Sequence, residues 1–504
     1  RRSAPAIPGA NGVVSGAGPG GLFTRASAAA ILAVALLGGV SCDSAPSSPE
    51  VPQEVTLTVL YTNDEHGWIE ETAETDGAAK LMGLWRADEG YDETGAFLVL
   101  SGGDNWTGPA ISTWFEGEST VEVMNAMGYA ASAIGNHEFD FRVAGLRDRI
   151  RDADFPFLSA NIRDRGSGGL PDFATPFVVE EVQGVRVGIV GLTTTSTPRT
   201  TFPPHVEDFE FISYGAALNE WVPQAWDAGA DVVLVIGHIC QGEMLSLVPV
   251  AQQLGISMIG GGHCNEVVAE THGTVALIEA GWRMAGYAKV GISFDLERGE
   301  VLSVQPSYSA NQGGSPDPAV ASVVGTWQQA AAAELSEVIG HVTSAIPQGS
   351  DALHNLITDS WLFVAPTADI AMTNSGGVRQ GIPAGDITLG TVVGVLPFQN
   401  TLVELDLTGQ EVVDCLAGTT IVAGMSTVGG YFHTDGTPLK MDSVYHVLTT
   451  DYLYALEGYR FHLYDQTPYL TGINYHQPTV TYLESLGTTP ADPLDNFLDH
   501  TPRR

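Results

Sequence analysis

Short apolar runs recur along the first three hundred residues and alternate with longer, more polar stretches. The runs are four to seven residues long and rich in β-branched side chains, which favours buried strands. They are residues 55–61, 97–100, 185–190, 232–236 and 256–259. Helix-like stretches lie between several of them, at residues 120–127 and 214–228. This alternation predicts an α/β domain built in layers.

A second pattern begins after residue 304. Residues 305–318 (QPSYSANQGGSPDP) are rich in Pro, Gly and Ser, and they end in Asp317 and Pro318, an N-cap and first-turn pair. The Ala-rich stretch that follows predicts a helix that Gly340 ends. We therefore expect a first domain over residues 55–304, a linker and interdomain helix over 305–340, a second domain over 341–486 and a tail over 487–504.

The N-terminal part has a different composition. An apolar run at residues 26–40 follows Arg25 and is too short for a membrane span of about 20 residues, so residues 1–42 predict an export signal. The small residues before Cys42 resemble a bacterial lipoprotein signal, in which that cysteine is lipidated. Residues 43–54 (DSAPSSPEVPQE) have the composition of a flexible linker. We expect a periplasmic or cell-surface protein whose only membrane contact is a lipid anchor on Cys42.

Composition and charge exclude some partners. The chain has 504 residues, 44% of them hydrophobic, which is enough for more than one domain with a substantial core. Asp and Glu number 59 against 21 Lys and Arg, so the formal net charge is -38. Such a surface repels phosphate backbones and anionic headgroups, which argues against nucleic-acid polymers and polybasic membrane docking.

The cysteines leave two alternatives open. Four cysteines are too few for a disulfide framework. A bridge between Cys240 and Cys264 is conceivable, because each closely follows a histidine. The other interpretation is that Cys240, Cys264 and Cys415 are three buried thiols.

Polar clusters follow the apolar runs. They share Asp, His and Asn residues next to glycines, which let the backbone turn sharply. The clusters are Asn63-Asp64-Glu65-His66, Gly102-Gly103-Asp104-Asn105, Gly135-Asn136-His137-Glu138, Gly237-His238 and Gly261-Gly262-His263-Cys264-Asn265. Ligand sites in α/β sheets lie at the carboxyl ends of strands, so these five clusters are expected to meet at one edge.

The residue types in these clusters indicate a metal site. Nitrogen and oxygen ligands of this kind suit Zn, Mn or another first-row divalent ion rather than Ca or a thiolate cluster. Asp64 and His66 are two residues apart, so both side chains of an extended segment would point the same way and reach one ion. A single Asp-x-His is more often only a turn beside a histidine, but five such clusters together favour a metal centre.

At these motifs the chain resembles the calcineurin-like metallophosphoesterases, and among them the two-domain 5′-nucleotidases. The segments that carry the resemblance are YTNDEHG (61–67), SGGDNWTG (101–108), GNHEFD (135–140), SANI (159–162), VIGH (235–238), GGGHCN (260–265), LHNLITD (353–359), TNSGGVR (373–379) and LPFQN (396–400). The resemblance implies an N-terminal four-layer αββα metallophosphoesterase domain, joined by a helix to an α/β C-terminal 5′-nucleotidase domain.

The resemblance also implies roles for individual residues. One of two divalent ions would be held by Asp64, His66, Asp104 and Asn265, and the second by Asp104, Asn136, His238 and His263. His137 and Asp140 match the catalytic pair, in which the His stabilises charge on the phosphoryl group or the leaving oxygen and the Asp orients its ring.

Each assignment has a simpler alternative. Asn136 and Asn265 could only cap turns, Asp140 could be a charge at a helix N-terminus, and Cys264 is interpreted as packing rather than as a ligand. Glu138 would lie close to the site, but the resemblance gives it no catalytic role.

The part expected to bind substrate matches less well. Asn374 and Arg379 match residues that hold the substrate in the family, and Phe398 matches the first of two rings that stack on a nucleobase, although Phe398 alone could belong to the core. Tyr452 is the expected second ring, but the Gly-Gly-Asp-Gly loop of the family is missing and Glu457-Gly458 is only a partial substitute. Residues 344–352 also lack an arginine that family members often have.

Three functions are therefore weighed. The first is an exported dimetal phosphohydrolase that removes the 5′-phosphate of nucleotides by attack of a metal-activated water. The second is a related phosphoesterase acting on cyclic nucleotides, nucleotide sugars or another phosphoester. The third is a non-catalytic surface protein stabilised by metal, against which the presence of both His137 and Asp140 argues.

Overall fold

The computed structural model describes residues 54–72 and 75–504, which fall within one compact unit. The expected export signal, the lipidation site Cys42 and nearly all of the expected linker lie outside the described residues. Among the helices of the described part, none combines the length and apolarity needed to cross a membrane.

Two six-stranded sheets form the first lobe. In the first sheet β1 (Glu54–Thr62), β2 (Phe97–Ser101), β3 (Tyr129–Ala133) and β4 (Phe157–Leu158) run parallel, and the antiparallel β13 (Gly286–Asp295) and β14 (Glu300–Ala310) extend it beyond β1. In the second sheet β12 (Val275–Ala280), β10 (Ile256–Gly260), β9 (Val232–Gly237) and β7 (Val185–Leu192) run parallel, between antiparallel edges β11 (Val267–His272) and β6 (Phe177–Val182).

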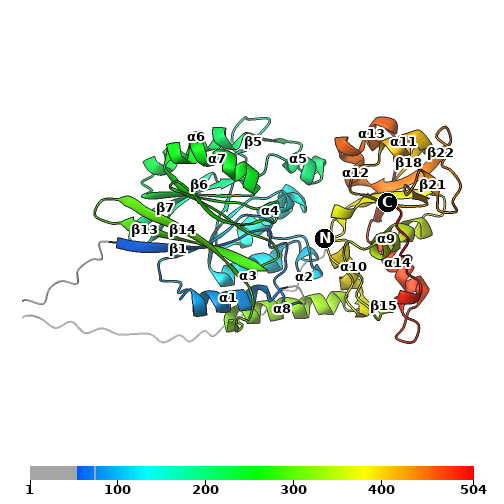
Figure 1. The fold of residues 1–504 in the computed structure, drawn as a ribbon, viewed down its shortest axis with the longest axis horizontal. Helices are drawn as coiled ribbons and strands as arrows, with labels where there is room; N and C mark the ends of the chain where they lie inside the picture. Colours follow the sequence, from blue (N-terminus) through cyan, green and yellow to red (C-terminus); the bar gives the residue numbers. More distant parts are fainter. Residues whose placement is uncertain (1–53, 73–74) are drawn as a thin grey trace, which may run out of the picture. The chain divides into compact units, whose positions relative to one another are not determined.

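The two sheets pack face to face and helices cover their outer faces. Side chains of both sheets, such as Val59 and Leu234, form one buried cluster between them. On the outer face of the second sheet, α6 (Tyr214–Asp227) and α7 (Gln241–Leu254) bury their apolar sides. On the outer face of the first sheet lie α1 (Gly77–Asp88), α3 (Glu118–Met127) and α8 (Pro318–Leu335). Figure 1 shows this helix, sheet, sheet, helix order, which confirms the expected four layers.

The structure confirms the expected elements and corrects one of them. Each of the five apolar runs forms a strand, and the two helix-like stretches form α3 and α6. The helix opened by Asp317 is also present, with the Asp317 carboxylate accepting hydrogen bonds from the amides of Ala319 and Val320. However, this helix ends at Leu335 rather than near Gly340, because Gly340 belongs to β15 (Val338–Val342) and pairs with β17 (Gly385–Thr388).

The second lobe is a mixed α/β structure around a five-stranded sheet. Its strand order is β19 (Thr420–Ala423), β16 (Ile370–Asn374), β22 (Val444–Thr450), β18 (Thr401–Thr408) and β23 (Tyr469–Asn474). One face packs on α9 (Asp351–Val364) and α14 (Gln477–Leu486). The other face packs on α11 (Gly409–Asp414), α12 (Asp451–Ala455) and α13 (Phe461–Tyr464). The chain ends against this lobe, where the Arg503 guanidinium pairs with Asp359 at 2.6 Å.

Candidate active site

The five polar clusters lie at the carboxyl ends of strands from both sheets. Asp64, Asp104 and Asn136 follow β1, β2 and β3 of the first sheet, whereas His238 and His263 follow β9 and β10 of the second. The clusters therefore meet where two facing sheets end, rather than along the single edge expected from the sequence. Side chains from both sheets can reach one point only because the sheets are stacked.

The backbone of these turns is strained. Asp64, His66, Asp104, His263 and Asn265 have φ values of 51°, 46°, 60°, 78° and 57°. Non-glycine residues seldom adopt this left-handed conformation, and each instance costs free energy that the surrounding structure must offset. Five of the seven expected metal ligands thus share this conformation.

Two buried carboxyl groups support the turns. The Glu138 carboxylate accepts hydrogen bonds from the amides of Asp104 (2.9 Å), Asn105 (2.8 Å) and Gly135 (2.6 Å), so it joins the turns after β2 and β3. The Glu65 carboxyl contacts the hydroxyls of Thr62 and Ser101, the latter at 3.0 Å, and joins the turns after β1 and β2. The sequence pattern indicated the proximity of Glu138 and included Glu65 in a polar cluster, but it gave neither residue this supporting role.

Burial and charge shift the pKa values of these two acids. Burial raises the pKa of Glu65 to about 8. Burial together with the negative charge of Asp104 raises the pKa of Glu138 to about 7. Both groups are fully enclosed, which places them in the framework of the site rather than on the surface that a ligand would touch.

His238 and His263 lie beside the two aspartates. His238 Nε2 is 2.8 Å from Asp104 Oδ2 and 4.0 Å from Asp64 Oδ1. His263 Nδ1 is 3.2 Å from His238 Nε2, and the amide of His263 donates to Asp64 Oδ2 at 2.9 Å. Ligand atoms of Asp104, His238 and His263 all lie within 4.8 Å of one another, close enough for one metal ion.

A second group of ligand atoms shares Asp104. His66, Asp104 and His137 also lie within 4.8 Å of one another, and Asp64 Oδ1 is 3.8 Å from His66 Nε2. Asp104 belongs to both groups, as expected of a residue that bridges two ions. His137 Nε2 is 4.0 Å from Asp104 Oδ2, so the expected catalytic histidine stands at the edge of the metal cluster.

The pKa values of the site are shifted by burial and by the charges of neighbouring carboxylates and imidazoles. Burial opposes protonation of His238, but the carboxylates of Asp104 and Asp64 outweigh it and raise the pKa of His238 to about 10. Burial would raise the pKa of Asp104, but His238 and His137 hold it well below its ordinary value. Burial and the neighbouring His238 lower the pKa of His263 to about 4. A buried pair of carboxylates that draws protons onto imidazoles is also an environment that attracts metal cations.

Asn136 provides a direct test of whether the residues suit a cation. Its Nδ2 donates to the Thr200 carbonyl at 3.1 Å, which fixes the orientation of the amide. Its Oδ1 is buried and has no hydrogen-bond partner among the described residues. A buried acceptor without a partner is costly, and a divalent ion beside Asp104 would satisfy it. The donor set and this free acceptor therefore fit a divalent metal.

His137 and Asp140 form a bonded pair. His137 Nδ1 is 2.8 Å from Asp140 Oδ2, and the amide of His137 donates to Asp104 Oδ1 at 2.8 Å. Burial lowers the pKa of His137, but the charges of Asp140 and Asp104 outweigh it, so the pKa is raised above its ordinary value. This pair can present a protonated Nε2 to a negatively charged group.

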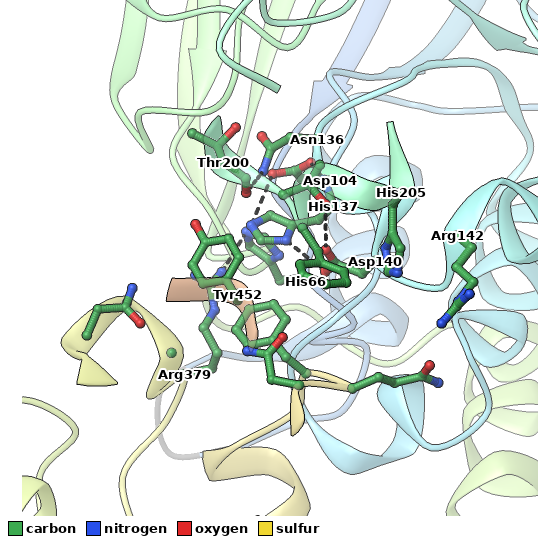
Figure 2. A pocket seen from close by; sticks show the side chains of 18 of the residues that line it. His66, Asp104, Asn136, His137, Asp140, Arg142, Thr200, His205, Arg379 and Tyr452 are labelled. Atoms are coloured by element: carbon green, nitrogen blue, oxygen red, sulfur yellow. Dashed lines mark hydrogen bonds and ion pairs between the residues drawn. The ribbon is translucent and has the colours of Figure 1, made fainter. Parts of the chain in front are cut away.

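One cavity of about 470 Å³ joins the metal-ligand cluster to the second lobe. Figure 2 shows His66, Asp104, His137 and Asp140 in it, with Arg379 and Tyr452 from the second lobe. All four expected substrate-binding residues line it: Asn374, Arg379, Phe398 and Tyr452. Asn265 also lines the cavity, whereas His238 is buried beneath it. Glu457 is exposed and does not belong to the lining, so it does not replace the missing acidic loop.

Arg379 and Phe398 lie directly over the metal-ligand side. Arg379 Nη2 is 3.0 Å from His66 Nε2, and the Phe398 ring is stacked 5.7 Å from the His137 ring. The Arg379 carbonyl accepts a hydrogen bond from Arg283 at 2.7 Å, and Arg283 stacks on Trp68 and Trp282 with its guanidinium carbon 4.3 and 3.7 Å from the two ring centres. Arg283 belongs to none of the sequence motifs, so it could not be predicted from them.

The structure contradicts the interpretation of Cys240, Cys264 and Cys415 as three buried thiols. Cys240 and Cys264 form a disulfide with their Cα atoms 5.2 Å apart, because the turns after β9 and β10 lie side by side. Cys415 is a free, buried thiol. The interpretation of Cys264 as inert packing is therefore wrong, and the conceivable Cys240–Cys264 bridge is present.

The chain is similar to known 5'-nucleotidases in sequence and in fold, and to protein UshA in sequence. The family described as "5'-nucleotidase, C-terminal domain" matches residues 330–433. Protein UshA of Escherichia coli (strain K12) is 29% identical over 438 residues, which cover 75% of this chain and 78% of that protein. A 5'-nucleotidase of Vibrio cholerae is 27% identical over 457 residues, covering 79% of this chain and 81% of its own. A crystal structure of a 5'-nucleotidase precursor from Thermus thermophilus shares the fold, with a TM-score of 0.73, 24% identity and coverage of 89% of this chain and 99% of that one.

Proposed function

Because the chain belongs to the 5′-nucleotidase family of two-domain calcineurin-like phosphoesterases, we propose that it is a dimetal phosphohydrolase that removes the 5′-phosphate of nucleotides. One observation carries the proposal: the Asp, His and Asn cluster opens into the same cavity as the His137–Asp140 pair and Arg379. A purely structural metal site closes its coordination shell and needs neither a cavity nor an acid pair.

We assign each expected ligand to one of two ions. Asp104 is shared between them, since it belongs to both groups of neighbouring ligand atoms. The first ion would be held by Asp64, His66, Asp104 and Asn265, and the second by Asp104, Asn136, His238 and His263. Zn, Mn and similar divalent ions suit this donor set. Bound there, two such ions supply the charge that activates a water for in-line attack and neutralises the phosphoryl oxygens.

His137 acts on the reacting phosphate from the edge of the cluster. Asp140 holds Nδ1 at 2.8 Å, so the ring is oriented and its protonated form is favoured. His137 Nε2 then donates to a phosphoryl oxygen or to the leaving oxygen, where negative charge grows in the transition state. Asp104 also holds the backbone of His137 in place, since its carboxylate accepts a hydrogen bond from the His137 amide.

The second lobe positions the substrate. Arg379 reaches within 3.0 Å of a ligand atom of His66, so its guanidinium can pair with the phosphate at the metals. Phe398 and Tyr452 line the same cavity and offer ring faces for the base, each contributing roughly 1–3 kcal/mol. Asn374 completes the polar lining on this side.

One observation favours the second candidate, a related phosphoesterase with another substrate. The family loop that should follow Tyr452 is replaced here, and Glu457 is exposed outside the cavity. Substrate choice depends on such contacts, so cyclic nucleotides, nucleotide sugars or another phosphoester are the competing class.

The proposal includes the location and organisation of the protein. The Cys240–Cys264 disulfide supports an oxidising compartment and hence export. As part of the proposal we keep domains over residues 55–304 and 341–486 joined by residues 305–340, a tail over 487–504 and a lipid anchor on Cys42. Residues 305–310, however, continue strand β14 of the first sheet, and Gly340 belongs to β15.

A phosphate-release panel on metal-loaded protein tests the function. Nucleoside monophosphates should be the best substrates, ahead of cyclic nucleotides, nucleotide sugars and a chromogenic phosphodiester. A preference for one of these others would select the second candidate. If no compound released phosphate while both metals were bound, the proposal would be refuted. The remaining interpretation would be a non-catalytic protein stabilised by metal.

A further inference from the structure

The disulfide lies between residues assigned to the metals. Cys240 is the N-cap of α7 and comes two residues after His238. Cys264 lies between His263 and Asn265. The crosslink therefore joins the turn after β9 to the turn after β10, and each of these turns carries a histidine assigned to the second ion.

The two turns differ in how firmly the rest of the protein holds them. His238 is fully buried, and its Nδ1 donates to the Gly102 carbonyl at 3.0 Å. His263 is only partly buried, Cys264 and Asn265 are exposed, and the backbone at His263 and Asn265 is left-handed. Outside the turn after β9, the turn after β10 is held by the His263 amide, which donates to Asp64 Oδ2 at 2.9 Å, and by the Tyr61 hydroxyl, which donates to the Gly261 carbonyl at 2.8 Å. The left-handed conformation of two non-glycine residues is unfavourable, so an exposed turn keeps it only where other contacts stabilise it.

Few other contacts hold the second turn against the first. The Gly262 amide donates to the Ile239 carbonyl at 2.9 Å, and the Gln241 amide donates to Glu266 Oε2 at 2.9 Å. By contrast, the turns after β1, β2 and β3 are joined by the buried carboxyl groups of Glu65 and Glu138. In the described part of the chain, no comparable buried carboxyl group joins the turns after β9 and β10. The Cys240–Cys264 disulfide joins these two turns instead.

We propose that the Cys240–Cys264 disulfide positions His238 and His263 as a pair, so that the protein retains its second divalent ion only while the crosslink is intact. The proposal rests on the dimetal site of the proposed function. Protein that surrounds a metal ligand and fixes its orientation typically changes metal affinity roughly 10–100-fold. The crosslink would thereby tie catalysis to an oxidising compartment.

The reductive step is a thiol–disulfide exchange. A dithiol reductant attacks the exposed Cys264 sulfur, the S–S bond breaks, and two electrons and two protons convert both cysteines to thiols while the reductant becomes a cyclic disulfide. The turn after β10 then keeps only its hydrogen bonds, such as the one from the His263 amide to Asp64, and loses its covalent link to the turn that carries His238. The His263 ring is then oriented less firmly toward His238, and the second ion is held more weakly by one of its two expected nitrogen ligands.

The test measures metal retention rather than turnover. A double variant, Cys240→Ala with Cys264→Ala, removes the crosslink and leaves no new thiol that could bind metal. Holoprotein is loaded with two equivalents of Zn and titrated with a competing chelator, and bound metal is counted by elemental analysis. We expect the variant to hold one ion with wild-type affinity and the other roughly 10–100-fold more weakly. Cys415→Ala, which removes a buried thiol of the second lobe, should hold both ions as the wild type does.

A second experiment tests the proposal even if the double variant does not fold. The folded wild-type holoprotein is treated with a dithiol, which reduces the disulfide. Reduction should release one equivalent of metal to the chelator, and reoxidation should allow it to bind again. Retention of both ions at wild-type affinity, or equal loss of both, would overturn the proposal. These outcomes are distinct from failure of the proposed function, which would show as two tightly bound ions without any phosphate release.

Discussion

The two sides of the cavity are built in different ways. On the first-lobe side, Asp64, Asp104 and His238 are almost completely buried, and each has fixed hydrogen-bond or ion-pair partners. On the second-lobe side, Arg379 and Phe398 are only partly buried and contact the first lobe through a few polar and ring contacts. Chemistry that depends on metal geometry needs fixed side chains, whereas stacking on a base tolerates variation in the ring and its surroundings.

The same difference appears in the sequence motifs. The metal-ligand side keeps every residue type that the family resemblance requires, while the substrate side lacks the acidic loop near Glu457. We infer that the reaction is more constrained than the choice of substrate. Substitutions on the two sides should therefore differ in kind: the first should remove metal or turnover, and the second should change only substrate affinity.

The largest effect is expected for Asp104→Asn. Asp104 belongs to both ligand groups, so the change weakens both ions at once. Phosphate release should fall by more than the roughly 10²–10⁴-fold typical of losing one acid or base. Elemental analysis should show both metals depleted. Asp172→Asn, which changes an exposed carboxylate paired with Arg147, is the control and should retain both metals and activity. Wild-type metal content in Asp104→Asn would refute the bridging role.

His137→Ala should be the next most severe change. The variant should lose roughly 10²–10⁴-fold in kcat with both metals still bound, because His137 acts on transition-state charge. His272→Ala on the surface strand β11 serves as the control. An increase confined to KM would make His137 a binding residue instead.

How far the sequence predicted the structure follows the same division. The five strands were evident from apolar runs, because a buried strand of an α/β domain is one continuous run in the sequence. The two helices α3 and α6 were evident as helix-like stretches between these runs. The end of α8 was wrong, since the pairing of Gly340 with β17 depends on a segment more than forty residues away. Glu65 and Arg283 were missed for the same reason: their partners Ser101 and Arg379 are distant in the chain.

A smaller effect is expected for Gly135→Ala, which acts through packing. A Cβ at this position would lie 2.1 Å from Asp104 Oδ1 and 2.8 Å from Glu138 Oε2, so Asp104 must move. Metal affinity should fall roughly 10–100-fold, as for other changes to groups that orient a metal ligand. Gly215→Ala in α6 meets no atom within 4 Å and is the matched control. Chelator competition measures both, and equal affinities would mean that the turn tolerates displacement of Asp104.

The smallest effects belong to the substrate side. Phe398→Ala and Tyr452→Ala should each weaken nucleotide binding by about 1–3 kcal/mol and leave metal content unchanged. The increase should appear in KM for nucleoside monophosphates and be absent for a small chromogenic phosphate ester that offers no base to stack. Phe363→Ala removes an aromatic ring of the same lobe that is 49% exposed, and it provides the control. If KM rose equally for both substrates, the rings of Phe398 and Tyr452 would be part of the core and would not stack on the base.

The central claim is that turnover requires both ions on the first-lobe side of the cavity. Protein stripped with chelator is titrated with Mn or Zn, and bound metal and nucleotide hydrolysis are measured on the same samples. We expect no phosphate release from the stripped protein and full activity only as the second equivalent binds. Full turnover in chelator, with metal shown absent by elemental analysis, would contradict the account.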